Sequence, residues 1–281
     1  MTYYSPAQRQ VGDATTALFV PATRPERFAK AASTSADVVL IDLEDAVAPE
    51  HKTKARASSI EALSRRDGFK AVVRINAVGT PYFADDLEAL TNLANTGGHG
   101  LLGLMVPKAE TTDTIGEIAE LTRSLGLSLV PLIESATGLI NAFDLARTPG
   151  VTRLAFGAID FCLDIDSSLD ERVLDHARSV LVLTSRAAGI RPPLDSPTTE
   201  IRDLRQVAES TRLARNFGFG GKLCIHPAQV AVVNSAFTPS EEDLRWATKV
   251  VQGDDAILEV DGQMIDRPVI ERAKRILRRA S

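Results

Sequence analysis

Two acidic residues stand where the chain could hold a divalent cation. Glu134 directly follows the apolar run 127–133, and Asp160 comes a few residues after the run 152–156. The two acids are 26 residues apart, about one strand–helix unit, so we expect them at the ends of neighbouring strands. Mg²⁺ takes one or two protein carboxylates and fills its octahedron with water and substrate oxygens. The alternative is two carboxylates that are solvated or cap helices separately.

A cluster of charged residues follows other apolar runs and offers partners for an anion. Arg74 stands in the apolar stretch 71–75, where a guanidinium is costly unless it meets an anion. That anion is either a substrate carboxylate bound through two hydrogen bonds or a structural partner, Glu44 or Asp45. Lys108 follows the run 102–106 and is either a ligand-binding cation or part of an ion pair within the barrel.

The last glycine-rich turn and a histidine are weaker candidates. Gly218, Gly220 and Gly221 precede Lys222, a candidate substrate-binding cation, and could bring the backbone close to a phosphate. A plain helix-to-strand turn is the favoured interpretation. His226 is more typical of a structural hydrogen-bonding residue than of a catalyst.

The elements that must position these residues form a repeating pattern. Eight apolar runs, each spaced from the next by about one strand–helix unit, alternate with stretches of helical period. The runs are 17–20, 38–43, 71–75, 102–106, 127–133, 152–156, 190–194 and 222–225. The pattern predicts a parallel sheet closed into a (β/α)₈ TIM barrel, with an open doubly wound sheet as the competitor. No GxGxxG or GxxxxGK[ST] follows a run, which weakens the nucleotide-binding form of that competitor.

The position of the polar residues supports one shared site. They cluster just beyond the carboxyl ends of seven of the eight runs. In a barrel these ends open on one face, where active sites form.

Three regions are predicted along the chain. Residues 1–14 are expected to be a loose N-terminal arm and residues 15–238 the barrel. Residues 239–281 are expected to form a C-terminal cap of helix, hairpin and helix, with the hairpin turning at Asp261-Gly262. A barrel does not need this extension, so we expect it to cover an active-site mouth, its own or a neighbour's.

The composition narrows the class of protein. The 281 residues include 32 Lys and Arg against 37 Asp and Glu, a net charge of −5, which argues against nonspecific nucleic-acid binding. No run of 18 apolar residues predicts a membrane helix, and the polar N-terminus is unlike a signal peptide. Cys162 and Cys224 form no CxxC pair, which favours a reducing cytoplasm. With no HExxH and no histidine cluster, Zn²⁺ is not expected.

Taken together, the motifs resemble those of a known family. The chain is similar to the citrate lyase beta subunit and to malyl-CoA and citramalyl-CoA lyases, within the HpcH/HpaI aldolase group, from about residue 17 to 279. The motifs that carry the resemblance are LFVP (18–21), DLEDAV (42–47), VRIN (73–76), VPK (106–108), IES (133–135), FGAID (156–160) and GKLCIHP (221–227).

The resemblance implies a (β/α)₈ barrel that assembles as a trimer or larger homo-oligomer and uses Mg²⁺. It implies the following roles: Glu134 and Asp160 as metal ligands, Arg74 as the arginine that holds the carboxylate and carbonyl end of the substrate, Glu44 and Asp45 as supporting acids, Asp266 as an acid that enters a neighbouring subunit's site, and the region of Arg24 as a loop approaching CoA. Ala22 and Gln263 depart from the Gly and Lys common in the family, and 161–165 lacks a common Gly. These departures leave the metal site intact and bear on acyl-CoA specificity.

The resulting hypothesis is a cytoplasmic, Mg²⁺-dependent carbon–carbon lyase. Its substrate would be a 3-hydroxyacyl CoA thioester of the citryl-CoA or malyl-CoA type, cleaved to a 2-oxo acid and an acyl thioester. One alternative is a Mg²⁺-dependent 2-oxo-acid aldolase that needs no CoA. Others are a malyl-CoA thioesterase and a subunit that acts only on a thioester carried by an acyl carrier protein.

Overall fold

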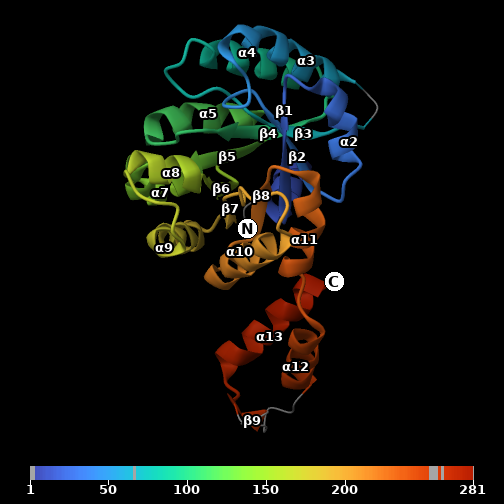
Figure 1. Ribbon diagram of the computed structural model, residues 1–281, viewed down its shortest axis with the longest axis vertical. Helices are drawn as coiled ribbons and strands as arrows, with labels where there is room; N and C mark the ends of the chain where they lie inside the picture. Colours follow the sequence, from blue (N-terminus) through green and yellow to red (C-terminus); the bar gives the residue numbers. More distant parts are fainter. Residues whose placement is uncertain (1–3, 66–67, 253–258, 261–262, 281) are drawn as a thin grey trace. The chain divides into compact units, whose positions relative to one another are not determined.

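The computed structural model describes residues 4–65, 68–252, 259–260 and 263–280. Eight parallel strands pair in sequence order, and β1 also pairs with β8, so the sheet is a closed barrel (Figure 1). The strands are β1 (Thr16–Pro21), β2 (Val38–Asp42), β3 (Ala71–Arg74), β4 (Leu101–Val106), β5 (Ser128–Ile133), β6 (Arg153–Phe156), β7 (Arg191–Asp195) and β8 (Gly221–Cys224). The prediction of a TIM barrel is confirmed, and the open sheet is excluded.

Helices follow the strands and cover the outside of the barrel. They are α2 (Phe28–Ala32), α3 (Lys52–Ser64), α4 (Phe83–Asn95), α5 (Thr112–Ser124), α6 (Ala136–Ile140), α7 (Ala142–Arg147), α8 (Ala158–Asp164), α9 (Glu171–Ala188), α10 (Leu204–Phe217) and α11 (Pro227–Phe237). Gly189 follows α9 with φ of 73°, a left-handed conformation that glycine adopts without strain and that commonly ends a helix. None of the described helices is long and apolar enough to cross a membrane.

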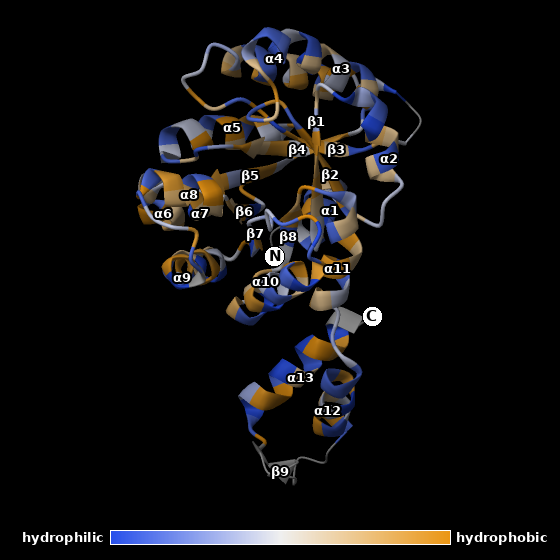
Figure 2. Ribbon diagram, in the orientation of Figure 1, coloured by the Kyte–Doolittle hydropathy of each residue, from blue (hydrophilic) through white to orange (hydrophobic). Residues whose placement is uncertain are grey.

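The strands read as continuous apolar runs because both of their faces are covered. Every residue of β2, β3, β4, β5 and β6 is buried. Figure 2 shows the strands as mostly hydrophobic, whereas helices such as α4 and α9 carry both hydrophobic and hydrophilic residues. This pattern is expected of a parallel sheet whose outer face packs on helices and whose inner face fills the barrel.

The prediction of a loose N-terminal arm is wrong. Helix α1 (Pro6–Asp13) begins with a capping box between Ser5 and Gln8, and Val11 is buried in the barrel's hydrophobic core. Arg153, the first residue of β6, donates hydrogen bonds to the carbonyl oxygens of Val11 and Ala14 at 3.1 and 2.7 Å. The helix therefore packs at the N-terminal ends of the strands, opposite the face where barrel sites form.

The chain divides into two compact units, Met1–Val233 and Asn234–Ser281, a division that lies a few residues before the predicted boundary. The second unit contains α12 (Glu241–Gln252), the antiparallel strands β9 (Glu259–Val260) and β10 (Gln263–Met264), and α13 (Arg267–Ala280). This order matches the predicted helix–hairpin–helix. The predicted turn at Asp261-Gly262 lies outside the described residues. A small core that includes Ala247, Ile265 and Ala273 holds α12 and α13 together.

Candidate active site

A cavity of about 480 Å³ lies at the carboxyl ends of the strands. Four of the predicted site residues line it: Asp45, Arg74, Glu134 and Asp160. They come from the ends of four different strands or from the loops that follow, so the barrel brings together residues that are far apart in sequence. The remaining walls are mostly apolar, from Phe19, Pro21, Ala46, Leu132, Ile159, Pro197, Leu223 and Ile225.

Glu134, just after β5, is the more deeply buried of the two predicted metal ligands, with 2% of its surface exposed. Its Oε1 accepts a hydrogen bond from the backbone N–H of Lys108 at 2.8 Å, while Oε2 has no hydrogen-bond partner among the described residues. A Cβ at Gly157 would lie 2.5 Å from that Oε2, so only glycine leaves it room. Burial, and then the negative charges of Glu44 and Asp160, raises the pKa of Glu134 to about 8.

Asp160 supplies the second carboxylate of the cavity. It lies in the first turn of α8, just after β6, and its charge acts on Glu134. Within the part of the chain that the structure describes, no group of three or more His, Cys, Asp or Glu residues gathers to hold a metal ion. The pair therefore suits an ion that accepts few protein ligands, as Mg²⁺ does, better than it suits zinc.

Arg74 is held by three acids beside the cavity. Its Nε and Nη2 donate to the two oxygens of Asp42, both at 2.7 Å. Its Nη1 lies 3.0 Å from an oxygen of Glu44 and 3.4 Å from one of Asp45. The structural salt bridge considered from the sequence is thus present, and it leaves the guanidinium at the cavity wall.

Asp42 is a residue of this cluster that the sequence analysis did not single out. It is the last residue of β2, is 2% exposed, and stands directly opposite Arg74 in the parallel register. The signal was present in the chain, since Asp42 is the first of three acids at the end of one apolar run. Its role depends on register, which sequence spacing did not reveal.

Lys108 adopts a strained backbone conformation, with φ of 48° in a residue other than glycine. This conformation directs its N–H to Glu134, while its Nζ lies 2.9 Å from Oε1 of Glu44. Of the two roles considered from the sequence, the structure contains the ion pair within the barrel. Lys108 thus links the Arg74 cluster to Glu134.

The prediction that Lys222 binds substrate is contradicted by its position. Its side chain is 2% exposed, and Nζ contacts Asp195 at 2.8 Å and Ser210 of α10 at 3.1 Å. The next residue, Leu223, lines the cavity. Because successive strand residues point to opposite faces, Lys222 faces the surrounding helices instead.

The structure does not bring the predicted residues Arg24 and Asp266 into the described lining of this cavity, and Asp266 belongs to the other compact unit. Arg24 is exposed and pairs with Glu26 at 2.6 Å, next to a separate cavity of about 360 Å³ lined by Thr23, His51 and Lys54. Asp266 belongs to the second unit, where its carboxylate caps α13 by accepting a hydrogen bond from the N–H of Val269.

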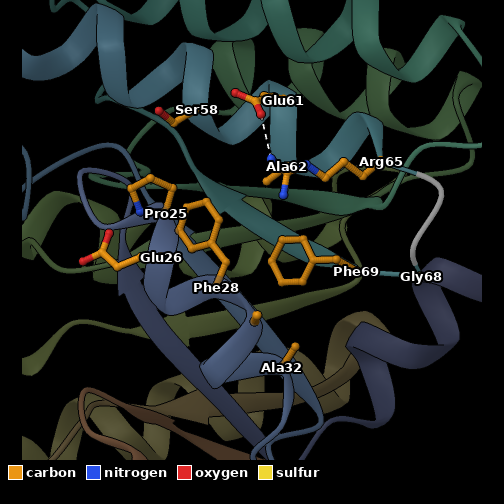
Figure 3. Close-up of a pocket in the computed structure, with 11 residues that line it drawn as sticks. Pro25, Glu26, Phe28, Ala32, Ser58, Glu61, Ala62, Arg65, Gly68 and Phe69 are labelled. Carbon is orange, nitrogen blue, oxygen red and sulfur yellow. Dashed lines mark hydrogen bonds and ion pairs between the residues drawn. The ribbon is translucent and has the colours of Figure 1, made fainter.

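A further cavity, of about 580 Å³, lies beside α2 and α3 (Figure 3). Phe28 and Phe69 stack along it with ring centroids 5.8 Å apart. Its ion pair joins two exposed residues, Glu61 in α3 and Arg65 just after the end of that helix. Among the described residues, no pair of buried carboxylates converges there, so the acidic cavity at the strand ends remains the candidate active site.

The closed barrel, with charged residues gathered at the carboxyl ends of its strands, defines the chain as a (β/α)₈ barrel of the enzyme type. The family model for HpcH/HpaI aldolase/citrate lyase matches residues 15–227. The chain therefore belongs to this family, as its motifs predict.

Similar proteins extend the match over nearly the whole chain. A citrate lyase subunit beta-like protein of Mycobacterium tuberculosis is 38% identical over 273 residues, which cover 94% of each chain. An L-malyl-CoA/beta-methylmalyl-CoA lyase of Cereibacter sphaeroides is 31% identical, over 94% of this chain and 93% of that protein. The crystal structure of CitE from M. tuberculosis in complex with magnesium, acetoacetate and coenzyme A matches with a TM-score of 0.81, 37% identity and coverage of 95% and 97%.

The raised pKa of Glu134 predicts a change of stability with pH. A carboxyl group with a pKa of about 8 when folded and 4.5 when unfolded stabilises the fold fully below pH 4.5 and loses that contribution as the pH rises through 8. Glu134→Gln mimics the protonated acid. Its free energy of unfolding should therefore match that of the unsubstituted protein at pH 5 and exceed it by about a few kcal/mol at pH 9, the free energy that corresponds to the pKa shift.

Urea unfolding in the presence of a chelator measures this difference. Glu120→Gln, at an exposed position on α5, is the control and should show no such trend. An advantage of Glu134→Gln that does not grow between pH 5 and pH 9 would contradict the assigned environment of Glu134.

The strain at Lys108 predicts an unusual order of stability for two variants. Lys108→Gly and Lys108→Ala both lose the ion pair with Glu44, but only glycine adopts a positive φ without strain. The glycine variant should be the more stable by about 1 kcal/mol. Glu88 is an exposed residue in the middle of α4 and serves as the control. There the alanine variant should be more stable than the glycine variant by about 1 kcal/mol, because glycine is a poor helix former. The same order at both positions would argue against strain at Lys108.

Proposed function

We propose that the protein is a Mg²⁺-dependent carbon–carbon lyase that cleaves a 3-hydroxyacyl CoA thioester into a 2-oxo acid and an acyl thioester. The observation that carries the proposal is the pairing of Glu134 and Asp160 in one cavity, with Oε2 of Glu134 buried and without a hydrogen-bond partner in the described part of the chain. The relatives named as a malyl-CoA lyase and as CitE bound to magnesium and coenzyme A support the choice of reaction and cofactor.

The residues present fit a magnesium ion. Oε2 of Glu134 and the carboxylate of Asp160 would hold it, and the glycine at position 157 keeps the space beside Oε2 open. When bound, the ion would supply a Lewis acid that offsets negative charge on the oxo-acid oxygen. The backbone N–H of Lys108 occupies Oε1 of Glu134, which leaves Oε2 as the oxygen without a hydrogen-bond partner among the described residues.

Arg74 would stabilise the second charge that develops. In the cleavage, the bond between the hydroxyl-bearing carbon and the carbon next to the thioester carbonyl breaks. The hydroxyl loses its proton and becomes the oxo group, and the thioester fragment leaves as an enolate that then takes up a proton. A guanidinium already oriented by Asp42 can donate to the enolate oxygen or to the oxo-acid carboxylate without reorganising.

Asp266 is proposed to move the proton to or from the enolate carbon, acting from the cap of a neighbouring subunit in a homotrimer or larger assembly. Asp266 is exposed, and one oxygen of its carboxylate accepts the hydrogen bond that caps α13. Its exposure leaves the side chain accessible to a neighbouring subunit.

The CoA moiety is proposed to approach along the loop that carries Arg24. The 360 Å³ cavity beside that loop is lined by Lys54, whose ammonium group can bind a phosphate, and by His51. A reducing cytoplasmic location is part of the proposal, with which the free, buried thiols of Cys162 and Cys224 agree.

The test is an assay of the purified chain alone with Mg²⁺. It should cleave malyl-CoA, citramalyl-CoA or citryl-CoA, and Asp160→Asn should reduce kcat/KM by at least about 10³-fold because it removes one of two metal carboxylates. Asp113→Asn, exposed in the first turn of α5, is the matched control and should retain activity.

The other outcomes separate the alternatives. Aldol cleavage of 2-oxo acids without CoA would favour the CoA-independent aldolase, and release of free CoA would favour the thioesterase. Activity only on a carrier-bound thioester would assign the chain to a multi-subunit enzyme. Full activity of Asp160→Asn would reject the carboxylate pair as the metal site.

Asp266→Ala gives a separate prediction about proton transfer. Turnover should fall by about 10²-fold or more, the usual contribution of a general acid or base, while Mg²⁺ binding measured by calorimetry stays unchanged. Asp266→Asn keeps the helix cap and should lose turnover equally. Loss of metal binding, or normal turnover in the asparagine variant, would contradict the role.

A further inference from the structure

We propose that Ser196 is a further ligand-binding residue of this cavity, whose hydroxyl donates a hydrogen bond to a carboxylate oxygen of the bound 2-oxo acid. Ser196 directly follows β7, lines the cavity and is 4% exposed. This inference rests on the proposed function and adds a residue to its site.

The end of β7 holds Ser196 in place. Asp195, the last residue of the strand, is 0% exposed and pairs with Lys222 at 2.8 Å and with Arg178 of α9 at 3.3 Å. Because successive residues of an extended chain point to opposite faces, Asp195 faces the helices and Ser196 faces the interior of the barrel. Pro197 follows and disfavours helical backbone conformations at Ser196.

One lone pair of the hydroxyl is already occupied. Oγ of Ser196 accepts a hydrogen bond from the backbone N–H of Ala158, the first residue of α8, at 3.0 Å. Other bonds also hold the start of α8: the N–H of Gly157 donates to the carbonyl oxygen of Ile133 at 2.9 Å, and the N–H of Phe161 donates to that of Gly157 at 3.0 Å. The contact with Ala158 therefore orients the hydroxyl, while the helix has supports of its own.

The hydroxyl proton of Ser196 has no acceptor among the described residues. Ser135 shows the contrast, because its Oγ accepts the N–H of Gly138 at 3.1 Å and donates to Oε1 of Glu110 at 2.6 Å. A hydroxyl is both a donor and an acceptor, and nearly buried polar groups are normally paired. Since Ser196 lines the cavity, a ligand bound there can supply the missing acceptor.

Few side chains of the cavity can donate to an anion. Apart from its acids, the described lining residues with polar side chains are Arg74 and Ser196. Arg74 already lies within 3.4 Å of oxygens from Asp42, Glu44 and Asp45. A carboxylate offers about four lone pairs on two oxygens, so it can accept from Ser196 while it also contacts the metal ion or Arg74.

The position of Ser196 relative to the proposed metal ligands fits this role. Its partner Ala158 lies in the same first turn of α8 as Asp160. The residue before Ala158 is Gly157, which borders Oε2 of Glu134. A 2-oxo acid held by an ion on these two carboxylates would therefore place its own carboxylate beside the hydroxyl.

Calorimetric titration of pyruvate into the full chain in saturating Mg²⁺ tests the assignment. Ser196→Ala should weaken pyruvate binding by about tenfold or more, the usual effect of losing a hydrogen bond to a charged group, and should leave the affinity for Mg²⁺ alone unchanged. Ser196→Thr keeps the hydroxyl and should restore pyruvate binding. Ser59→Ala, which removes a buried hydroxyl on α3, is the control and should change neither affinity.

Steady-state kinetics with the thioester that the unsubstituted protein cleaves gives a second readout. The charge of the carboxylate does not change during cleavage, so the hydrogen bond stabilises the substrate and the transition state equally. Ser196→Ala should therefore raise KM by about tenfold and leave kcat unchanged. A merely structural role, exerted through displacement of Asp160, would lower kcat instead.

Each contrary result has a distinct meaning. Pyruvate binding by Ser196→Ala as tight as that of the unsubstituted protein overturns the inference and leaves the proposed lyase function standing. An equal loss of Mg²⁺ affinity in Ser196→Ala, or a threonine variant as weak as the alanine variant, also overturns it. Failure of the unsubstituted protein to bind pyruvate in Mg²⁺ rejects the proposed function and the inference with it.

Discussion

The bidentate pairing of Arg74 with Asp42 is the interaction on which the rest of the site depends. Burying a cluster of carboxylates in a barrel mouth costs free energy unless a cation lies among them. The Arg74 guanidinium forms ion pairs with both Asp42 and Glu44, and these contacts fix its orientation. A buried cation that is already oriented is suited to stabilise a charge that appears only during a reaction.

Two features of the backbone adapt the same cavity to a metal ion. The strained conformation of Lys108 delivers an N–H to one oxygen of Glu134, and the missing side chain of Gly157 leaves space beside the other. Strain persists in a fold only where the surrounding structure enforces it, and it gathers at functional sites. The two oxygens of Glu134 are thereby made unequal before any ligand arrives.

The arrangement also explains how a family can share a reaction and differ in substrate. The lining of the cavity combines charged residues with apolar residues such as Leu132, Leu223 and Ile225. Under the proposed function, we expect substitutions among these apolar residues to change which substituent is accepted while Arg74 and Glu134 stay in place. Asp266 lies in the second unit, so the proposed proton-transfer residue can vary independently of the barrel.

The sequence by itself determined the barrel and its acidic pair, because a strand buried on both faces must be a continuous apolar run and parallel strands end on one face. The eight runs, and the placement of Glu134 and Asp160 after two adjacent ones, followed from that constraint. Only the tertiary structure decided which residues meet across strands. Asp42 opposes Arg74 through the register, and Lys222 points outward because its strand turns Leu223 inward. The N-terminal helix escaped prediction for a similar reason. Its short polar sequence buries few apolar side chains of its own, and it is held instead by Arg153, which lies far along the chain.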